Sequence, residues 1–182
     1  AVDLSKRERA RILNVDMGGG TTKFCLIEDG VVSQTASINV GARLIAFDET
    51  GVITRLEDAG RIIMEEIGYP TAPGRRITAG EQEAFAAFMA GIIFEMIEKG
   101  PVSPLAKRFM VTLPFRNYRG LDQLDHIVVS GGVSEHVYDR DRTAYGDVGP
   151  LLGEKVRTYL EGLPRKDMFR EPDEGIRATV IG

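Results

Sequence analysis

One acid, three glycines and two threonines stand close together in the stretch NVDMGGGTTKFCL, at residues 14–26. The acid is Asp16, and the residues that follow Met17 are Gly18, Gly19, Gly20, Thr21 and Thr22. Glycines let a backbone bend sharply and bring its N–H groups close to an anion, and threonine hydroxyls add donors. A carboxylate at the end of a strand can hold a hydrated Mg²⁺ or orient a water molecule. The stretch therefore favours a phosphate cradle, and the alternative is a glycine-rich hairpin in which Asp16 makes a turn hydrogen bond.

A second glycine pair follows another apolar run, in HIVVSGGVSEHVY at residues 126–138. Bare backbone at Gly131 and Gly132, beside Ser130 and Val133, lets a flat ring or a sugar-phosphate come close. Ligands of open α/β sheets bind at such strand ends. The alternative is again a tight strand-to-helix turn. The two glycine turns follow apolar runs that are far apart in the sequence. Their joint occurrence favours one nucleotide site over two unrelated structural turns.

Two familiar nucleotide motifs do not fit the first turn. The P-loop pattern G-x-x-x-x-G-K-[ST] leads into a helix, whereas here Lys23 follows two threonines and a strand comes next. The dinucleotide pattern G-x-G-x-x-G also opens a helix. Only Gly18 and Gly20 have the spacing of its first two glycines, and its last glycine would fall at Lys23. What remains is a hairpin of strand, glycine turn and strand.

The composition excludes several classes of protein. The chain has 182 residues, a formal net charge of -4, and hydrophobic and charged fractions of 43% and 27%, which indicate one globular domain or two small lobes. The acidic balance gives no electrostatic reason to expect nucleic acid. A single cysteine excludes an internal disulfide, and two histidines are too few for a histidine-rich metal site. No apolar run reaches the roughly 20 residues of a membrane span, so we expect a cytoplasmic protein with no membrane partner.

The glycine turns lie between strands that the hydrophobic pattern predicts. The pair Asp29-Gly30 between apolar runs is a strong hairpin signal, so the chain opens with a three-stranded meander. The run at 108–115 is expected to be a strand or an extended segment. The predicted strands cover 11–15, 22–30, 31–41, 51–56, 108–115, 124–132 and 176–182.

Three helices are predicted, at 58–68, 78–100 and 146–162. Helix 78–100 is the clearest, since Thr78 can cap it and Glu81 has the spacing of a capping box. Strands that come first as a meander and then alternate with helices indicate an α/β layer with a mixed sheet. The stretch 57–100 is a candidate inserted helical lobe. Because the chain ends on the strand-like run IRATVIG, we expect it to be a piece of a longer protein.

The motifs resemble a known superfamily. DMGGGTT resembles the second phosphate-binding loop of the actin, Hsp70 and sugar-kinase ATPases, and VVSGGVSEHVY resembles their adenosine loop. More narrowly, NVDMGGGTTKFCLIEDG, INVGARLI, VSGGVSEHVY, YGDVGPLLGEKV and IRATVIG resemble the ethanolamine ammonia-lyase reactivating factors of that superfamily. The resemblance covers nearly all of residues 1–182 and corresponds to a C-terminal or middle portion without the first phosphate loop. One departure is Ala42, where the family often has a second glycine.

The resemblance implies a fold, ligands and site residues. The fold would be a ribonuclease H-like mixed sheet flanked by helices, the second large domain of an actin-like ATPase. The ligands would be ATP or ADP with Mg²⁺, and Asp16 would contact Mg²⁺ or the attacking water. The phosphates would lie on Gly18, Gly19, Gly20, Thr21 and Thr22. The adenosine would be bordered by Ser130, Gly131, Gly132 and Val133.

The resemblance also implies a function. Such factors are chaperone-like ATPases that help damaged cobalamin to leave inactivated ethanolamine ammonia-lyase, an adenosylcobalamin enzyme. The lyase would be the partner, in the cytoplasm or in association with a bacterial microcompartment, and a homodimer is one state that the sequence leaves open. Two alternatives remain: another kinase of the superfamily, for which no substrate base stands out, and a nucleotide-independent interaction module. Since half of the cleft would be missing, we expect this chain alone to bind nucleotide weakly and to hydrolyse it slowly.

Several other residues could do chemistry but are better explained by structure. Arg43 is expected at the surface, with a contact to phosphate or to another lobe as the alternative. Glu135 and His136 are also expected at the surface, with a contact to adenosine as the alternative. Cys25 is expected in the core, and His126 is expected to cap an element or to face solvent.

Overall fold

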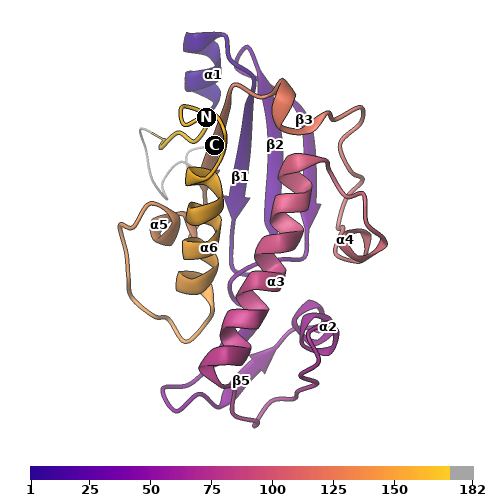
Figure 1. Ribbon diagram of the computed structural model, residues 1–182, viewed down its shortest axis with the longest axis vertical. Helices are drawn as coiled ribbons and strands as arrows, with labels where there is room; N and C mark the ends of the chain where they lie inside the picture. The colour runs from indigo at the N-terminus through magenta and orange to yellow at the C-terminus, as the bar shows by residue number, and fades with distance from the viewer. Residues whose placement is uncertain (173–182) are drawn as a thin grey trace.

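The computed structural model describes residues 1–172, which form one main sheet, a small second sheet and a set of helices (Figure 1). The strands are β1 Ile12–Met17, β2 Thr22–Glu28, β3 Val31–Ile38, β4 Ile45–Phe47, β5 Ile53–Leu56 and β6 His126–Ser130. The α-helices are α1 Val2–Glu8, α2 Asp58–Glu66, α3 Ala79–Glu98, α4 Pro104–Arg108, α5 Ser134–Val137 and α6 Gly149–Glu161, and the 3-10 helix η1 spans Gly120–Gln123. Within residues 1–172, no helix combines the length and the apolar composition that crossing a bilayer requires.

The main sheet has the strand order β3-β2-β1-β6. β2 runs antiparallel to both β1 and β3, whereas β6 lies parallel to β1. Asp29 and Gly30 connect β2 to β3 with φ values of 51° and 79°, the left-handed conformation that a tight two-residue hairpin needs. The predicted meander and the predicted fold class, a mixed sheet flanked by helices, are therefore confirmed.

The strand register brings the two glycine turns to the same end of the sheet. Asp16 in β1 lies beside Lys23 of β2 on one side and beside Ser130 of β6 on the other. Because β1 and β6 are parallel, their carboxyl ends meet at one edge of the sheet. Each glycine turn begins at one of these ends.

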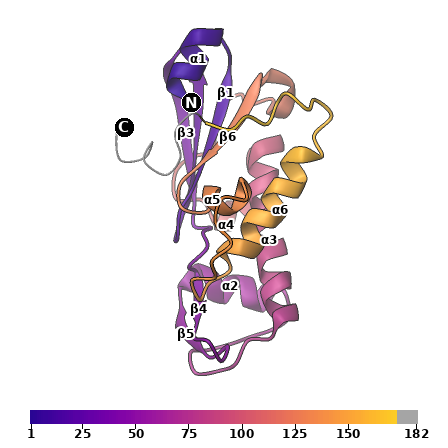
Figure 2. The same cartoon turned by 90° about the vertical axis from the view of Figure 1, so that its left-hand side faces the viewer.

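Helices α3 and α6 pack against each other and cover one face of the main sheet (Figure 2). Every second strand residue on that face is buried, as a half-covered sheet requires: the central ones are Leu13, Val15, Met17, Phe24, Leu26, Ile127 and Val129. α3 also contacts α2 and η1, so both its large residues, such as Phe85, and its small ones, such as Ala86, are buried. Thr78 and Glu81 form the predicted capping box at its start.

The opposite face of the sheet is covered at one end by α1. A small apolar cluster there contains Ile12, Ile27 and Val128, with Leu4 of the helix packed against it. Cys25 lies half-buried at the edge of this cluster, and burial raises the pKa of its thiol. The polar residues of β1, including Asp16, lie on the same face, since side chains alternate along a strand.

The small sheet and α2 lie at the lower end of the molecule in Figure 1. β4 pairs antiparallel with β5, and two residues of α2, Ile63 and Met64, join the same hydrophobic cluster as the main sheet. α3 belongs to that cluster as well. The two helices of the predicted lobe at 57–100 thus share one hydrophobic core with the main sheet. That this stretch is a separate inserted lobe stays a prediction.

Three further comparisons with the sequence predictions concern residues 108–115, two short helices and residues 176–182. Residues 108–115 make one isolated bridge, between Met110 and Ile38 of β3, and no further strand pairing, and Pro114 has no N–H group with which to continue a ladder. Helices α1 and α4 were not predicted, although Ser103 caps α4 and a proline stands in its first turn, both known start signals. The strand predicted at 176–182 lies outside the described residues.

Candidate functional site

The two glycine turns lie against each other. Gly131 has a φ of +84°, and a methyl group built on it would lie 2.5 Å from the carbonyl oxygen of Met17 and 2.6 Å from Oδ1 of Asp16. The N–H group of Val133 donates to the same Met17 carbonyl at 3.1 Å. The structure therefore brings the predicted acid of the first turn into contact with the predicted adenosine loop.

The segment that follows β3 closes the outer side of the first turn. The N–H of Ala42 donates to the carbonyl of Gly18 at 3.2 Å, and the N–H of Arg43 donates to the carbonyl of Gly19 at 2.6 Å. A methyl group on Gly41 would lie 2.6 Å from the Gly19 carbonyl oxygen, so only glycine fits there. The stretch INVGARLI is thus part of the site, and Arg43 is exposed as predicted.

Two of the predicted contact residues point into the core. Thr22 is fully buried, and its hydroxyl donates to the carbonyl oxygen of Val40 at 2.7 Å. The side chain of Val133 is also buried. Both residues hold their turns in place: Thr22 ties the first turn to the segment after β3, and Val133 ties the second turn to the end of β1 through its backbone.

Other parts of the turns are open. Gly20 and Gly132 are exposed, and a methyl group on either of them would meet no atom within 4 Å. Thr21 is half-buried, and its carbonyl accepts the N–H of Gly18 at 3.0 Å, which closes the turn on itself. The arrangement leaves exposed backbone at the middle of both turns.

Asp16 presents a carboxylate that the described residues leave without a hydrogen bond or ion pair. No group of three or more metal-binding side chains occurs within residues 1–172. A free carboxylate beside open glycine backbone fits a Mg²⁺ ion that keeps most of its water and takes its other ligands from phosphate oxygens. The residues present therefore fit a Mg²⁺-nucleotide, as the sequence predicted.

Sequence reasoning missed one polar residue of the site. Asn14 stands two residues before Asp16 in β1, and its Nδ2 donates to Oγ of Ser130 at 3.1 Å. This bond links β1 to β6 next to the acid. The available signal was a polar residue inside an apolar strand, at the period-two spacing that places it on the same face as Asp16.

Both histidines are buried, with exposed fractions of 8% for His126 and 9% for His136. The prediction that His136 lies at the surface was therefore wrong, and of the two roles expected for His126 the solvent-facing one is excluded. His126 contacts the Glu8 carboxylate through Nε2 at 3.1 Å and the Asp167 carbonyl through Nδ1 at 3.0 Å. His136 contacts the Asp141 carbonyl through Nδ1 at 2.7 Å. The partners of His126 lie far away in the chain, which a sequence does not reveal, whereas the partner of His136 lies five residues on.

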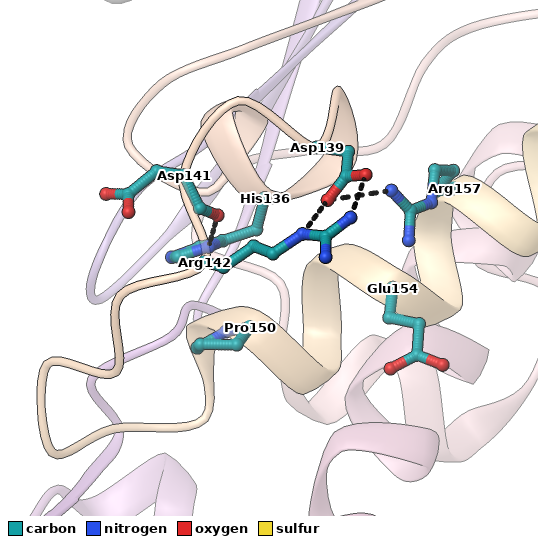
Figure 3. A pocket seen from close by; sticks show the side chains of 7 residues that line it. All are labelled: His136, Asp139, Asp141, Arg142, Pro150, Glu154 and Arg157. Carbon is teal, nitrogen blue, oxygen red and sulfur yellow. Dashed lines mark hydrogen bonds and ion pairs between the residues drawn. The ribbon is translucent and has the colours of Figure 1, made fainter.

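A pocket of about 340 Å³ lies beside α5 and α6 (Figure 3). Asp139 accepts hydrogen bonds from Arg142 at 2.8 and 2.7 Å and pairs with Arg157 at 3.6 Å, and the Arg142 bonds lower the pKa of Asp139 to about 2. Glu135 is half-buried nearby and pairs with Arg140 at 3.5 Å. The pocket is lined by His136, Asp139, Asp141, Arg142, Pro150, Glu154 and Arg157. None of these residues belongs to the two glycine turns.

Two solved structures resemble part of the fold. A Ppx/GppA phosphatase from Aquifex aeolicus matches 75% of this chain and 30% of its own, with a TM-score of 0.36 and 17% identity. Component A of the (R)-2-hydroxyglutaryl-CoA dehydratase from Acidaminococcus fermentans matches 88% of this chain and 55% of its own, with a TM-score of 0.32 and 12% identity. Both TM-scores are too low to support a conclusion about function.

The sequence comparisons are more specific. The family model for the ethanolamine utilisation protein EutA matches residues 1–182. Two curated relatives, from Salmonella typhimurium strain LT2 and Escherichia coli K12, are named ethanolamine ammonia-lyase reactivase EutA, and each is 36% identical over all of this chain. The chain spans 38% of the length of these relatives. It therefore belongs to the EutA family of ethanolamine utilisation proteins.

Proposed function

We propose that this chain is the nucleotide-binding part of an ATP-dependent reactivating factor, which releases damaged cobalamin from inactivated ethanolamine ammonia-lyase. The observation that carries the proposal is the contact between Gly131 and Asp16, because it unites two glycine turns and a free carboxylate at one end of the sheet. The names of the curated relatives support the choice of the lyase as partner. A homodimer and a place in or near a bacterial microcompartment belong to the same proposal.

In this proposal the two turns bind different parts of ATP or ADP. Exposed backbone at Gly20 accepts the phosphates, with Gly18, Gly19 and Thr21 forming the rest of the cradle and Thr22 supporting it from the core. Gly132 and Ser130 border the adenosine, with Gly131 and Val133 fixing that turn against β1. Bare backbone suits both tasks because it lets N–H groups and flat rings approach closely.

Asp16 would hold the Mg²⁺ ion of the nucleotide or orient the attacking water molecule. When bound, Mg²⁺ supplies positive charge that offsets the charge of the phosphate oxygens. The chain contributes the position of the carboxylate, which β1 fixes next to Gly131 and which has no competing partner among the described residues. Nucleotide binding can drive cobalamin release only if it favours a state of the factor that binds the lyase differently.

Calorimetric titration of the chain with Mg·ATP and Mg·ADP, beside an Asp16→Ala variant, tests the proposal. We expect Mg²⁺-dependent binding that the variant weakens by about tenfold or more, since bonds to charged groups contribute roughly 1.5–3 kcal/mol. Asp122→Ala is the matched control, because Asp122 is an exposed acid in η1, before the start of β6 and away from the site. Equal binding by all three forms, or no binding by the unaltered chain at millimolar nucleotide, would contradict a working cradle here.

A further inference from the structure

Arg43 lies directly over the phosphate turn. A methyl group built on Gly19 would lie 3.4 Å from both Cδ and Cγ of the Arg43 side chain. The backbone of Arg43 is fixed to the same residue, since its N–H donates to the Gly19 carbonyl at 2.6 Å. The backbone of this arginine is therefore held directly against the glycine turn.

Among the described residues, the guanidinium of Arg43 pairs with one charged group, and the two side chains differ sharply in exposure. Its Nε lies 3.3 Å from Oδ2 of Asp147, and the exposed fractions of the two side chains are 56% and 7%. The arginine thus faces solvent at the open side of the turn, while the carboxylate stays covered. A guanidinium has five N–H donors, and the described residues offer the others no hydrogen bond.

Asp147 does not depend on the arginine alone. Its Oδ1 accepts the N–H of Gly149 at 2.8 Å, at the start of α6. The next residue, Val148, donates its N–H to the carbonyl of Ala42 at 3.3 Å, so the two segments are tied by backbone as well. If the guanidinium turns toward another anion, the carboxylate keeps a partner. Asp147 therefore orients Arg43 without locking it.

The place of Arg43 along the turn indicates which anion it meets. Gly131 contacts Asp16 and Met17 at the start of the turn, whereas Arg43 covers Gly19 farther along. A nucleotide whose adenosine borders Gly131 and Gly132 would extend its phosphates along the turn toward Arg43. Arginine suits this task because its planar fork of donors matches phosphate oxygens.

We infer that Arg43 binds the terminal phosphate of the nucleotide and so sets the preference for a nucleoside triphosphate over a diphosphate, with Asp147 as its positioning residue. The inference rests on the proposed function and adds to it a residue outside the two glycine turns. In this inference the stretches INVGARLI and YGDVGPLL both contribute to binding the terminal phosphate, since Arg43 belongs to the first and Asp147 to the second.

The test compares the affinities of four forms of the chain for Mg·ATP and for Mg·ADP by calorimetry. The variants are Arg43→Ala, Arg43→Lys and the control Arg55→Ala. Arg55 lies on β5 and is similarly exposed, but it pairs with Glu57 at 2.5 Å. We expect Arg43→Ala to weaken Mg·ATP about tenfold and Mg·ADP less than about threefold, as the loss of one charge-assisted contact predicts. Arg43→Lys should recover part of the preference, and Arg55→Ala should match the unaltered chain.

The outcomes separate this inference from the proposed function. If Asp16→Ala abolishes binding but Arg43→Ala leaves the ratio of ATP to ADP affinity unchanged, the inference is wrong and the proposed function stands. An equal loss for both nucleotides, without recovery in Arg43→Lys, would show that Arg43 only holds the turn, which also overturns the inference. If the unaltered chain binds neither nucleotide, the proposed function fails and the inference fails with it.

Discussion

The two glycine turns of the site differ in how tightly the rest of the molecule encloses them. In the second turn, Gly131 has a φ of +84° and faces the end of β1 so closely that any side chain would collide with Met17 or Asp16. In the first turn the nearest atom to a methyl group on Gly18 would be 3.3 Å away, and Gly20 has open space around it. The fold thus requires a glycine in the second turn, whereas protein contacts do not explain the last glycine of the first.

This difference teaches that a run of glycines can have two separate causes. Gly131, and likewise Gly41 against Gly19, are required because one backbone passes close to another. Gly20 and Gly132 meet no neighbouring atom, so no protein contact requires bare backbone there, and the proposed function gives it a role in ligand binding. Stability measurements report on the first kind and binding measurements on the second, and each prediction below uses that contrast.

The largest effect is expected for Gly131→Ala. Its backbone conformation is strained for any other residue, and the methyl group would overlap the Met17 carbonyl, which a packed sheet cannot move cheaply. We expect a loss of about 3 kcal/mol or more in the free energy of unfolding, measured by urea denaturation. The adjacent Gly132→Ala is the control and should change stability by less than about 1 kcal/mol in either direction. Similar losses in both variants would mean that the contact with β1 does not make Gly131 more important for stability than Gly132.

A smaller effect, and on another property, is expected for Gly20→Ala. A methyl group there meets no other atom. The free energy of unfolding, measured by urea denaturation, should therefore stay within about 0.5 kcal/mol of that of the unaltered chain. The same methyl group would stand where phosphates approach, so affinity for Mg·ATP should fall about tenfold, which corresponds to roughly 1.4 kcal/mol. Calorimetry on the folded variant checks this. Unchanged affinity would leave Gly20 as an ordinary hairpin residue and would remove the contrast between the turns.

How much of this site the sequence could reveal depends on the distance between its parts. The turn residues 16–22 and the hairpin at Asp29-Gly30 are local, so their types and spacing predicted them. The contact of Gly131 with Asp16 required the parallel pairing of β6 with β1, which only the fold specifies. Arg43 is exposed, as the sequence predicted, but its pairing with Asp147, about a hundred positions away in the chain, could not be predicted.

The same reasoning explains the missed or misjudged elements. Helix α4 has five residues, too few for a helical period to show. Residues 108–115 are apolar enough to suggest a strand, yet they follow the edge of β3 with one bridge only. His136 was misjudged because α5 packs against α6, where a methyl group on Gly153 would lie 2.5 Å from Cβ of His136. For residues 108–115 and for His136, contacts distant in sequence outweighed the local pattern, whereas α4 was missed because it is short.

Glu81, at the start of α3, has a structural role and lies outside the candidate site. A substitution there shows how far a change in stability alone affects nucleotide binding. Its carboxylate accepts the N–H of Thr78 at 2.8 Å and pairs with Arg75. The hydrogen bond from Arg75, and those from Thr78, hold the pKa of Glu81 below its ordinary value of 4.5. The folded chain therefore binds this proton more weakly than the unfolded chain does. It follows that the contribution to stability is present above about pH 4.5 and is lost as the pH falls through the lower pKa of the folded state.

Glu81→Gln keeps an oxygen for the capping box but removes the charge. We expect it to lower the free energy of unfolding by about 1 kcal/mol or less at pH 7 and to flatten the decline of stability below pH 4.5, while nucleotide affinity stays unchanged. Glu83→Gln is the control, since Glu83 pairs with Lys155 at 2.6 Å with half of its side chain exposed, and exposed pairs contribute little. Urea denaturation of both variants between pH 3 and 7 gives the two profiles. If Glu81→Gln also weakened nucleotide binding, a loss of stability far from the site would be enough to lower the affinity. Reduced affinity in Gly20→Ala could then no longer be attributed to a ligand contact.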